Sequence, residues 1–115
     1  MNTYGVYYMK PDFFQDGIMG AKWCRRKGML PDPSKIDATH IYLGVFKATD
    51  LEDLFRRMQG ENWSPNGEAA PMIAAKGLHH TSMSVGDIAV DCDSFDCHMV
   101  DSFGFVRLGG PSNDR

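Results

Sequence analysis

The chain has 115 residues, of which 43% are hydrophobic and 23% are charged, with a formal net charge of -3 at pH 7. A chain of this length has room for one domain, so we expect a single domain over residues 1–115 with a flexible polar tail at 109–115. The composition excludes a disordered chain, and the apolar runs are too short for a membrane span.

The N-terminus and the cysteines favour a cytoplasmic location. The first residues lack the basic region and long apolar core of a secretory signal. Cys24, Cys92 and Cys97 form no Cys-x-x-Cys pair and are odd in number. Reduced thiols are therefore expected rather than a disulfide framework.

Strand-forming residues open the chain. Residues 3–9 are rich in aromatic and β-branched types and predict a strand that Pro11 ends. Three glycines between residues 12 and 28 disfavour a long helix, which leaves a short helix over residues 21–27. Residues 31–34 contain two prolines and predict a loop.

A second strand followed by a capped helix is the clearest part of the pattern. Residues 40–46 predict the strand, and Thr49 with Glu52 predicts a capping box. The helix is expected from Asp50 to Gln59, with Gly60 ending it. Its expected apolar stripe is Leu51, Leu54, Phe55 and Met58, and its expected solvent face is Glu52, Asp53, Arg56 and Arg57.

The remaining residues predict a long connection and a hairpin. Residues 61–80 are interrupted by prolines and glycines and have room for about one helical turn. Residues 87–91 and 98–108 predict two antiparallel strands, with a bulge at Gly104 in the second. The whole pattern predicts an α+β fold, a small antiparallel sheet of about four strands with one main amphipathic helix packed on one face.

Charge is distributed unevenly along the chain. Residues 1–60 carry nine Lys/Arg against seven Asp/Glu, whereas residues 61–115 carry three against eight. The acidic C-terminal half disfavours nucleic-acid binding over the whole protein surface, because such binding depends on Lys and Arg. It favours binding to a basic partner. The candidate partner-binding residues lie in the hairpin loop and are Asp91, Asp93, Phe95 and Asp96.

A basic cluster supports an alternative function. Four cations in six residues beside a tryptophan could contact phosphates and stack on a base, which favours a DNA- or RNA-binding accessory or regulatory factor. The residues of this cluster are Lys22, Trp23, Arg25, Arg26 and Lys27.

The spacing of the histidines and cysteines disfavours a metal site. Adjacent residues of an extended segment point to opposite faces, so His79 with His80, and Cys97 with His98, are poorly placed to share one ion. Cys92 and Cys97 are one ligand pair where a structural zinc site needs two. We therefore expect no metal and no cofactor. A small hydrolase that uses a cysteine, such as Cys24 beside its cations, or paired carboxylates is the second alternative.

Two short motifs carry a resemblance to a known family. They are Ser82-Met83-Ser84-Val85-Gly86-Asp87-Ile88 and Val100-Asp101-Ser102-Phe103-Gly104-Phe105. With the helix from Asp50 to Gln59 and the following Asn62, residues 49–108 resemble the YodL-like family of small bacterial domains often carried on phages, plasmids and integrative elements. The resemblance implies no catalytic residue. Read physically, Gly86-Asp87 is a tight turn into a strand, so the motifs are expected to specify structure.

From these observations we expect a non-enzymatic protein of a phage or plasmid that acts in the cytoplasm of a bacterial host cell. It would bind and inhibit a host protein machine through its acidic surface. An anti-CRISPR or anti-restriction inhibitor is the concrete form of this hypothesis.

Overall fold

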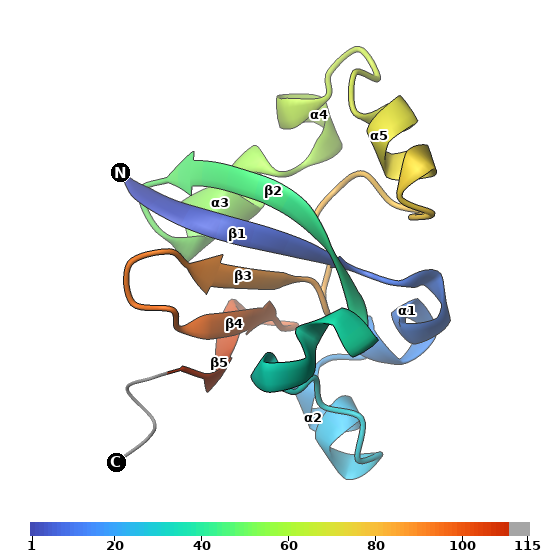
Figure 1. The fold of residues 1–115 in the computed structure, drawn as a ribbon, viewed down its shortest axis with the longest axis vertical. Coiled ribbons are helices and arrows are strands. Elements are labelled where there is room, and N and C mark those ends of the chain that lie inside the picture. Colours follow the sequence, from blue (N-terminus) through green and yellow to red (C-terminus); the bar gives the residue numbers. More distant parts are fainter. Residues whose placement is uncertain (111–115) are drawn as a thin grey trace.

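A five-stranded antiparallel sheet forms the centre of the computed structural model, which describes residues 1–110 (Figure 1). The strands are β1 (Asn2–Met9), β2 (His40–Ala48), β3 (Ile88–Asp91), β4 (Cys97–Val100) and β5 (Phe105–Gly109). Their order in the sheet is β2-β1-β3-β4-β5, and each neighbouring pair is antiparallel. This confirms the expected α+β class, with five strands in place of about four.

The fifth strand arises because the expected strand over residues 98–108 is broken by a turn. The Asp101 N–H donates to the Gly104 carbonyl at 2.8 Å, and Gly104 has a φ of +71°. Gly104 therefore ends a turn and is not a bulge within one strand, as the sequence had suggested. The predicted tail also begins too early, because Gly109 is a buried residue of β5. Residues 111–115 of that predicted tail lie outside the described residues.

Short helices connect the strands. They are α1 (Pro11–Gly17), α2 (Ala21–Arg26), the 3₁₀ helix η1 (Pro33–Ala38), α3 (Leu51–Arg57), α4 (Gly60–Trp63) and α5 (Ala70–Ala75). Over residues 1–110, no helix combines the length and the apolar character needed to cross a membrane.

Four of these helices, α1, η1, α4 and α5, differ from the sequence expectation, and at α1 the breaking residues sit at the helix ends. Pro11 occupies the first turn of α1, where its missing N–H costs nothing, and Gly17 is the last residue of that helix. Asp32 caps η1 by accepting a hydrogen bond from the Ser34 N–H, so the predicted loop over 31–34 leads directly into a helix. The long connection over 61–80 holds most of α4 and all of α5, where one helical turn was expected.

The main helix α3 is present, but its cap lies one residue later than expected. Asp50 is the N-cap and accepts from the Asp53 N–H at 2.8 Å, while the Asp53 carboxylate accepts from the Thr49 N–H at 2.9 Å. The predicted Thr49–Glu52 box is therefore wrong. Asp53 is also buried and paired with Arg56 and Arg57, so it does not face solvent as predicted.

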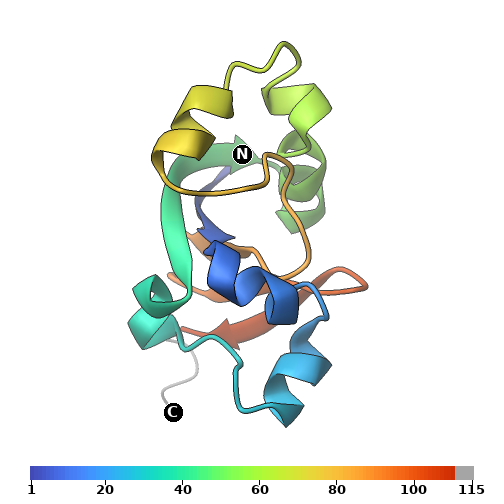
Figure 2. The same cartoon turned by 90° about the vertical axis from the view of Figure 1, so that its right-hand side faces the viewer.

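Helices cover both faces of the sheet (Figures 1 and 2). On one face, Leu54 and Met58 of α3 pack with Val6 and Tyr8 of β1 in the largest core cluster. On the opposite face, Ile36 of η1 packs against a second cluster built from β3 and β4. The main helix thus packs on one face as predicted, but the other face is also partly covered.

The first motif ties α3 to the sheet. The Met83 N–H donates to the Met58 carbonyl at 3.1 Å, and the Ser82 hydroxyl accepts from the Gly60 N–H at 2.7 Å. The two motifs also lie side by side. The Gly86 N–H donates to the Val100 carbonyl at 2.9 Å, and the Val100 N–H donates to the Asp87 carbonyl at 2.8 Å.

Replacing Gly86 tests this packing. Gly86 has a φ of +100°, and an added Cβ would lie 2.8 Å from the carbonyl atoms of Gly17 and would also collide with the Met9 sulfur. Gly77 has a similar φ of +72° but open space around it. Gly86→Ala should lower the free energy of unfolding by about 1–3 kcal/mol more than Gly77→Ala, because only the first variant overpacks the interior. Urea denaturation of both variants measures this difference, and equal losses would contradict the packing described.

Candidate functional site

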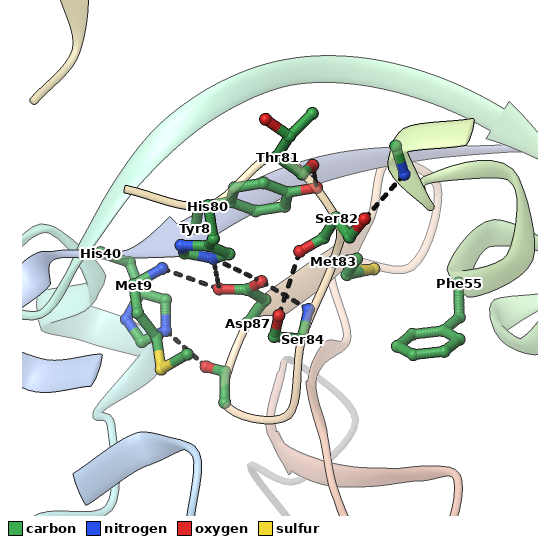
Figure 3. Close-up of polar contacts among 12 residues, drawn as sticks. Tyr8, Met9, His40, Phe55, His80, Thr81, Ser82, Met83, Ser84 and Asp87 are labelled. Atoms are coloured by element: carbon green, nitrogen blue, oxygen red, sulfur yellow. Dashed lines mark hydrogen bonds and ion pairs between the residues drawn. The ribbon is translucent and has the colours of Figure 1, made fainter. Parts of the chain in front are cut away.

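The contacts of the first motif, residues 82–88, converge on the buried carboxylate of Asp87 (Figure 3). Asp87 has no exposed surface. Its Oδ1 accepts from the Met9 N–H and its Oδ2 from the Ser84 N–H, each at 2.8 Å. His80 Nε2 lies 2.9 Å from Oδ2 and completes the set of donors. One side chain thus joins the end of β1, the turn before β3 and the segment after α5.

Two effects oppose each other at Asp87. Burial raises the pKa of its carboxyl group, whereas His80 and the two backbone N–H groups favour the ionised form. The paired imidazole is itself enclosed, because the His80 ring stacks on Tyr8 at 4.6 Å and meets the edge of Phe14 at 5.0 Å. The Tyr8 hydroxyl donates to the Thr81 carbonyl at 2.7 Å, which fixes the strand that carries this ring.

The His80 side chain is partly exposed and lines a pocket with Phe14 and Ile18, but the ring nitrogen that does not face Asp87 is not exposed. His80 Nδ1 is buried and has no hydrogen-bond partner among residues 1–110. A general base must present its free nitrogen to the proton that it removes. The pair is therefore placed to hold structure. From the sequence, His80 was considered only as a metal ligand, and its contact with Asp87 was missed. The aspartate in the Gly86-Asp87 turn was the one signal for a hydrogen-bond acceptor at this place.

A second buried histidine supports the same turn. His40 Nε2 donates to the Gly86 carbonyl at 2.7 Å, and its Nδ1 lies 2.7 Å from the Thr39 hydroxyl. Burial lowers the pKa of His40 to about 4. The neutral imidazole therefore holds the Gly86 carbonyl at pH 7.

The predicted acidic residues form a closed hairpin loop between β3 and β4. The Asp91 N–H donates to the Asp96 carbonyl at 2.9 Å, and the Phe95 N–H donates to the Asp91 carbonyl at 2.7 Å. The Asp91 carboxylate accepts from the N–H groups of Asp93 and Ser94 at 2.8 and 3.2 Å. The loop is thus fixed by its own hydrogen bonds.

The four candidate residues of this loop have different roles. Asp96 pairs with Arg107 of β5, and Asp91 organises the loop backbone. Asp93 is exposed, and its carboxylate makes no hydrogen bond or ion pair with the described residues. The Phe95 side chain is 62% exposed. The backbone of this residue has a φ of +62°, in the left-handed region that bulky residues rarely adopt. Of the four candidate residues, Asp93 and Phe95 are therefore the two whose side chains are exposed.

The basic cluster lies on α2. Lys22, Arg25, Arg26 and Lys27 are exposed, but the Trp23 ring is half-buried. Its indole N–H donates to Asp16, and the Lys27 ammonium lies 4.9 Å from the ring centroid. The chain's own cation thus lies over the ring that was expected to stack on a base. Nucleic-acid binding by this cluster stays a prediction that rests on its exposed cations.

The residues considered for metal binding and catalysis do not converge. Within residues 1–110, no three His, Cys, Asp or Glu side chains are placed to hold a metal ion. Cys24 is buried, and burial together with Asp16 raises the pKa of its thiol, contrary to the lowering expected from the adjacent cations. Burial likewise raises the pKa of Cys97 to about 11. Both therefore remain protonated thiols at pH 7.

Comparison of the chain with protein-family models, with curated proteins and with solved structures found no match. The resemblance to the YodL-like family stays a prediction based on the motif residues. Their physical role is nevertheless defined by the contacts of Asp87 and by Asp101, whose carboxylate accepts from the Ala21 N–H at the start of α2.

Replacing Asp87 tests its structural role. In Asp87→Asn, one of the two backbone N–H groups faces an amide donor in place of a carboxylate oxygen, and His80 loses its charged partner. We expect the free energy of unfolding to fall by about 3 kcal/mol. Asp93→Asn is the matched control on the exposed loop and should change it by less than about 0.5 kcal/mol. Urea denaturation followed by circular dichroism compares the two, and a loss of less than 1 kcal/mol for Asp87→Asn would refute the role.

The lowered pKa of His40 predicts a pH dependence of stability. The folded pKa of about 4 lies below the ordinary value of 6.5, so its contribution is present above pH 6.5 and is lost as the pH falls toward 4. This loss should reach about 3 kcal/mol. In His40→Gln, the amide can still donate to Gly86 but does not titrate. Unfolding measured from pH 7 to 4 should show a shallower fall for this variant, and parallel curves would contradict the assignment.

Proposed function

We propose that this chain is a non-enzymatic binding protein of a phage or plasmid that occupies a host protein machine in the bacterial cytoplasm and inhibits it. The partner contact is the tip of the β3–β4 hairpin, with Phe95 as the apolar anchor and Asp93 as the charged contact. An anti-CRISPR or anti-restriction inhibitor is the form of this function that we favour.

The backbone of Phe95 is the observation that carries the proposal. A bulky residue in the left-handed region costs about 1–2 kcal/mol. Phe95 is 62% exposed and belongs to none of the core clusters of residues 1–110. Strained residues of this kind concentrate at functional sites. Aromatic residues, including Phe, are also enriched in the buried cores of protein interfaces.

The loop is already ordered before it binds. The hydrogen bonds of Asp91 close the turn, and Asp96 is held by Arg107 on the neighbouring strand. A partner therefore spends little binding energy on ordering the tip. The hairpin projects from one edge of the molecule (orange, at the left of Figure 1), where a protein surface can reach it.

Charge indicates the kind of partner. The half of the chain that contains this tip carries eight acidic against three basic residues. An acidic surface is complementary to the basic grooves with which defence complexes hold nucleic acid. Such a protein would compete for the groove without performing chemistry.

A substitution at Phe95 separates binding from folding. Asparagine tolerates the left-handed region, so Phe95→Asn removes the ring and relieves strain. The variant should unfold no more easily than the natural chain, but it should retain the host partner from bacterial lysate at least tenfold less well. Quantitative mass spectrometry of the retained proteins measures this loss. In cells with an active CRISPR or restriction system, the natural chain should raise the transformation efficiency of a targeted plasmid and the variant should not.

Phe103 provides the matched control. It is 97% exposed and lies in the turn at the other end of β4, so Phe103→Asn makes the same chemical change away from the tip. This control should retain the partner fully, whereas Asp93→Lys should lose it. Equal retention by Phe95→Asn and the natural chain, or no retained protein above background, would rule out the proposed contact.

A further inference from the structure

A groove lies beside the second motif, between α3 and the β4–β5 turn. Its volume is about 350 Å³, which is at the lower end of the range of about 300–1,000 Å³ typical of ligand sites. Phe55, Val85, Val100 and Phe105 supply its apolar lining, and Glu52, Asp101, Ser102 and Gly104 supply the rest. The groove therefore has room for one or two apolar side chains beside two carboxylates.

The two carboxylates of this groove, Glu52 and Asp101, have oxygen atoms that can accept hydrogen bonds from a bound molecule. Asp53, and not Glu52, accepts the hydrogen bond of the Thr49 N–H. Glu52 is exposed and forms no hydrogen bond or ion pair within residues 1–110. Asp101 uses Oδ1 to accept from the Ala21 and Ser102 N–H groups, and no described group donates to its Oδ2. No cation of the described residues lines the groove. A basic side chain would complement this charge.

The neighbouring strand is at the edge of the sheet. β5 pairs with β4 on one side and, among the described strands, has no neighbour on the other. Phe105, its first residue, also lines the groove. An extended chain added to β5 would form backbone hydrogen bonds there and direct alternate side chains toward the groove. A helix, which is about 10–12 Å wide, would not enter a groove of this size.

We propose that this groove binds an extended segment of another protein, which adds to the β5 edge and places an apolar side chain next to a lysine or arginine. The apolar side chain contacts Phe55 and Phe105, and the basic side chain pairs with Glu52 and Asp101. This contact is separate from the hairpin tip, because Asp93 and Phe95 do not line the groove. Either proposal can therefore fail while the other holds.

Peptides displayed on phage provide the probe. Random twelve-residue peptides are selected on the immobilised full chain, and an enriched peptide is synthesised and measured by fluorescence anisotropy. The selected peptides should share an apolar residue within two positions of Lys or Arg. Amide NMR shifts on binding should centre on Val85, Gly104 and Phe105. Methylation of one alternating set of peptide N–H groups should abolish binding, and methylation of the other set should not.

Two glutamates give a matched pair of variants. Glu52 and Glu61 are both exposed and both lie in the first turn of a helix, but only Glu52 lines the groove. Glu52→Lys should weaken peptide binding about tenfold, Glu52→Gln should weaken it less, and Glu61→Lys should change it less than twofold. Equal effects of the two lysine variants, selected peptides without the apolar and basic pair, or shifts that centre on the hairpin tip would each overturn the proposal.

Discussion

The carboxylate of Asp87 is the group on which the arrangement of this chain depends. It has no exposed surface, and it accepts hydrogen bonds from Met9, which is 78 residues away in the sequence, and from the nearer His80 and Ser84. A buried carboxylate that lacks its donors costs several kcal/mol. The end of β1, the segment after α5 and the turn before β3 are thus held to one arrangement. His40 extends this constraint by holding the Gly86 carbonyl in the same turn.

The acidic residues of the two motifs consequently accept hydrogen bonds from backbone N–H groups. Asp87 binds N–H groups in the interior, and Asp101 binds the Ala21 N–H where α2 begins. The side chains that we propose for partner contacts lie at the two ends of β4. Phe95 and Asp93 occupy the hairpin tip at one end, and the groove with Glu52 lies near the turn at the other. The motifs therefore specify a scaffold, and the surfaces proposed for binding are displayed on it.

Local patterns in the sequence predicted the local structure. The apolar stripe of α3 and the strand formers of β2 depend on neighbouring residues alone, so both elements were found. The cap of α3 was misplaced by one residue because Thr49 and Asp50 are both good capping residues. The turn that separates β4 from β5 was missed, although an Asp followed three residues later by Gly is a common turn signal.

Side-chain contacts that form only when separate elements pack together could not be predicted in this way. No local pattern indicates that His80 meets Asp87, or that Arg107 pairs with Asp96 and leaves Asp93 as the exposed acid of the loop. The acidic loop itself was identified from composition. Its division into residues that hold the loop and residues whose side chains are exposed follows only from the fold.

Site-resolved amide hydrogen exchange of the free chain tests the central claim most directly. If Asp87 holds the fold together, the Met9 and Ser84 amides that donate to it should exchange only when the whole chain unfolds, with the same free energy as global unfolding in urea. Exchange of these two amides through a local opening, at rates similar to those of the exposed loop at residues 92–95, would contradict the account.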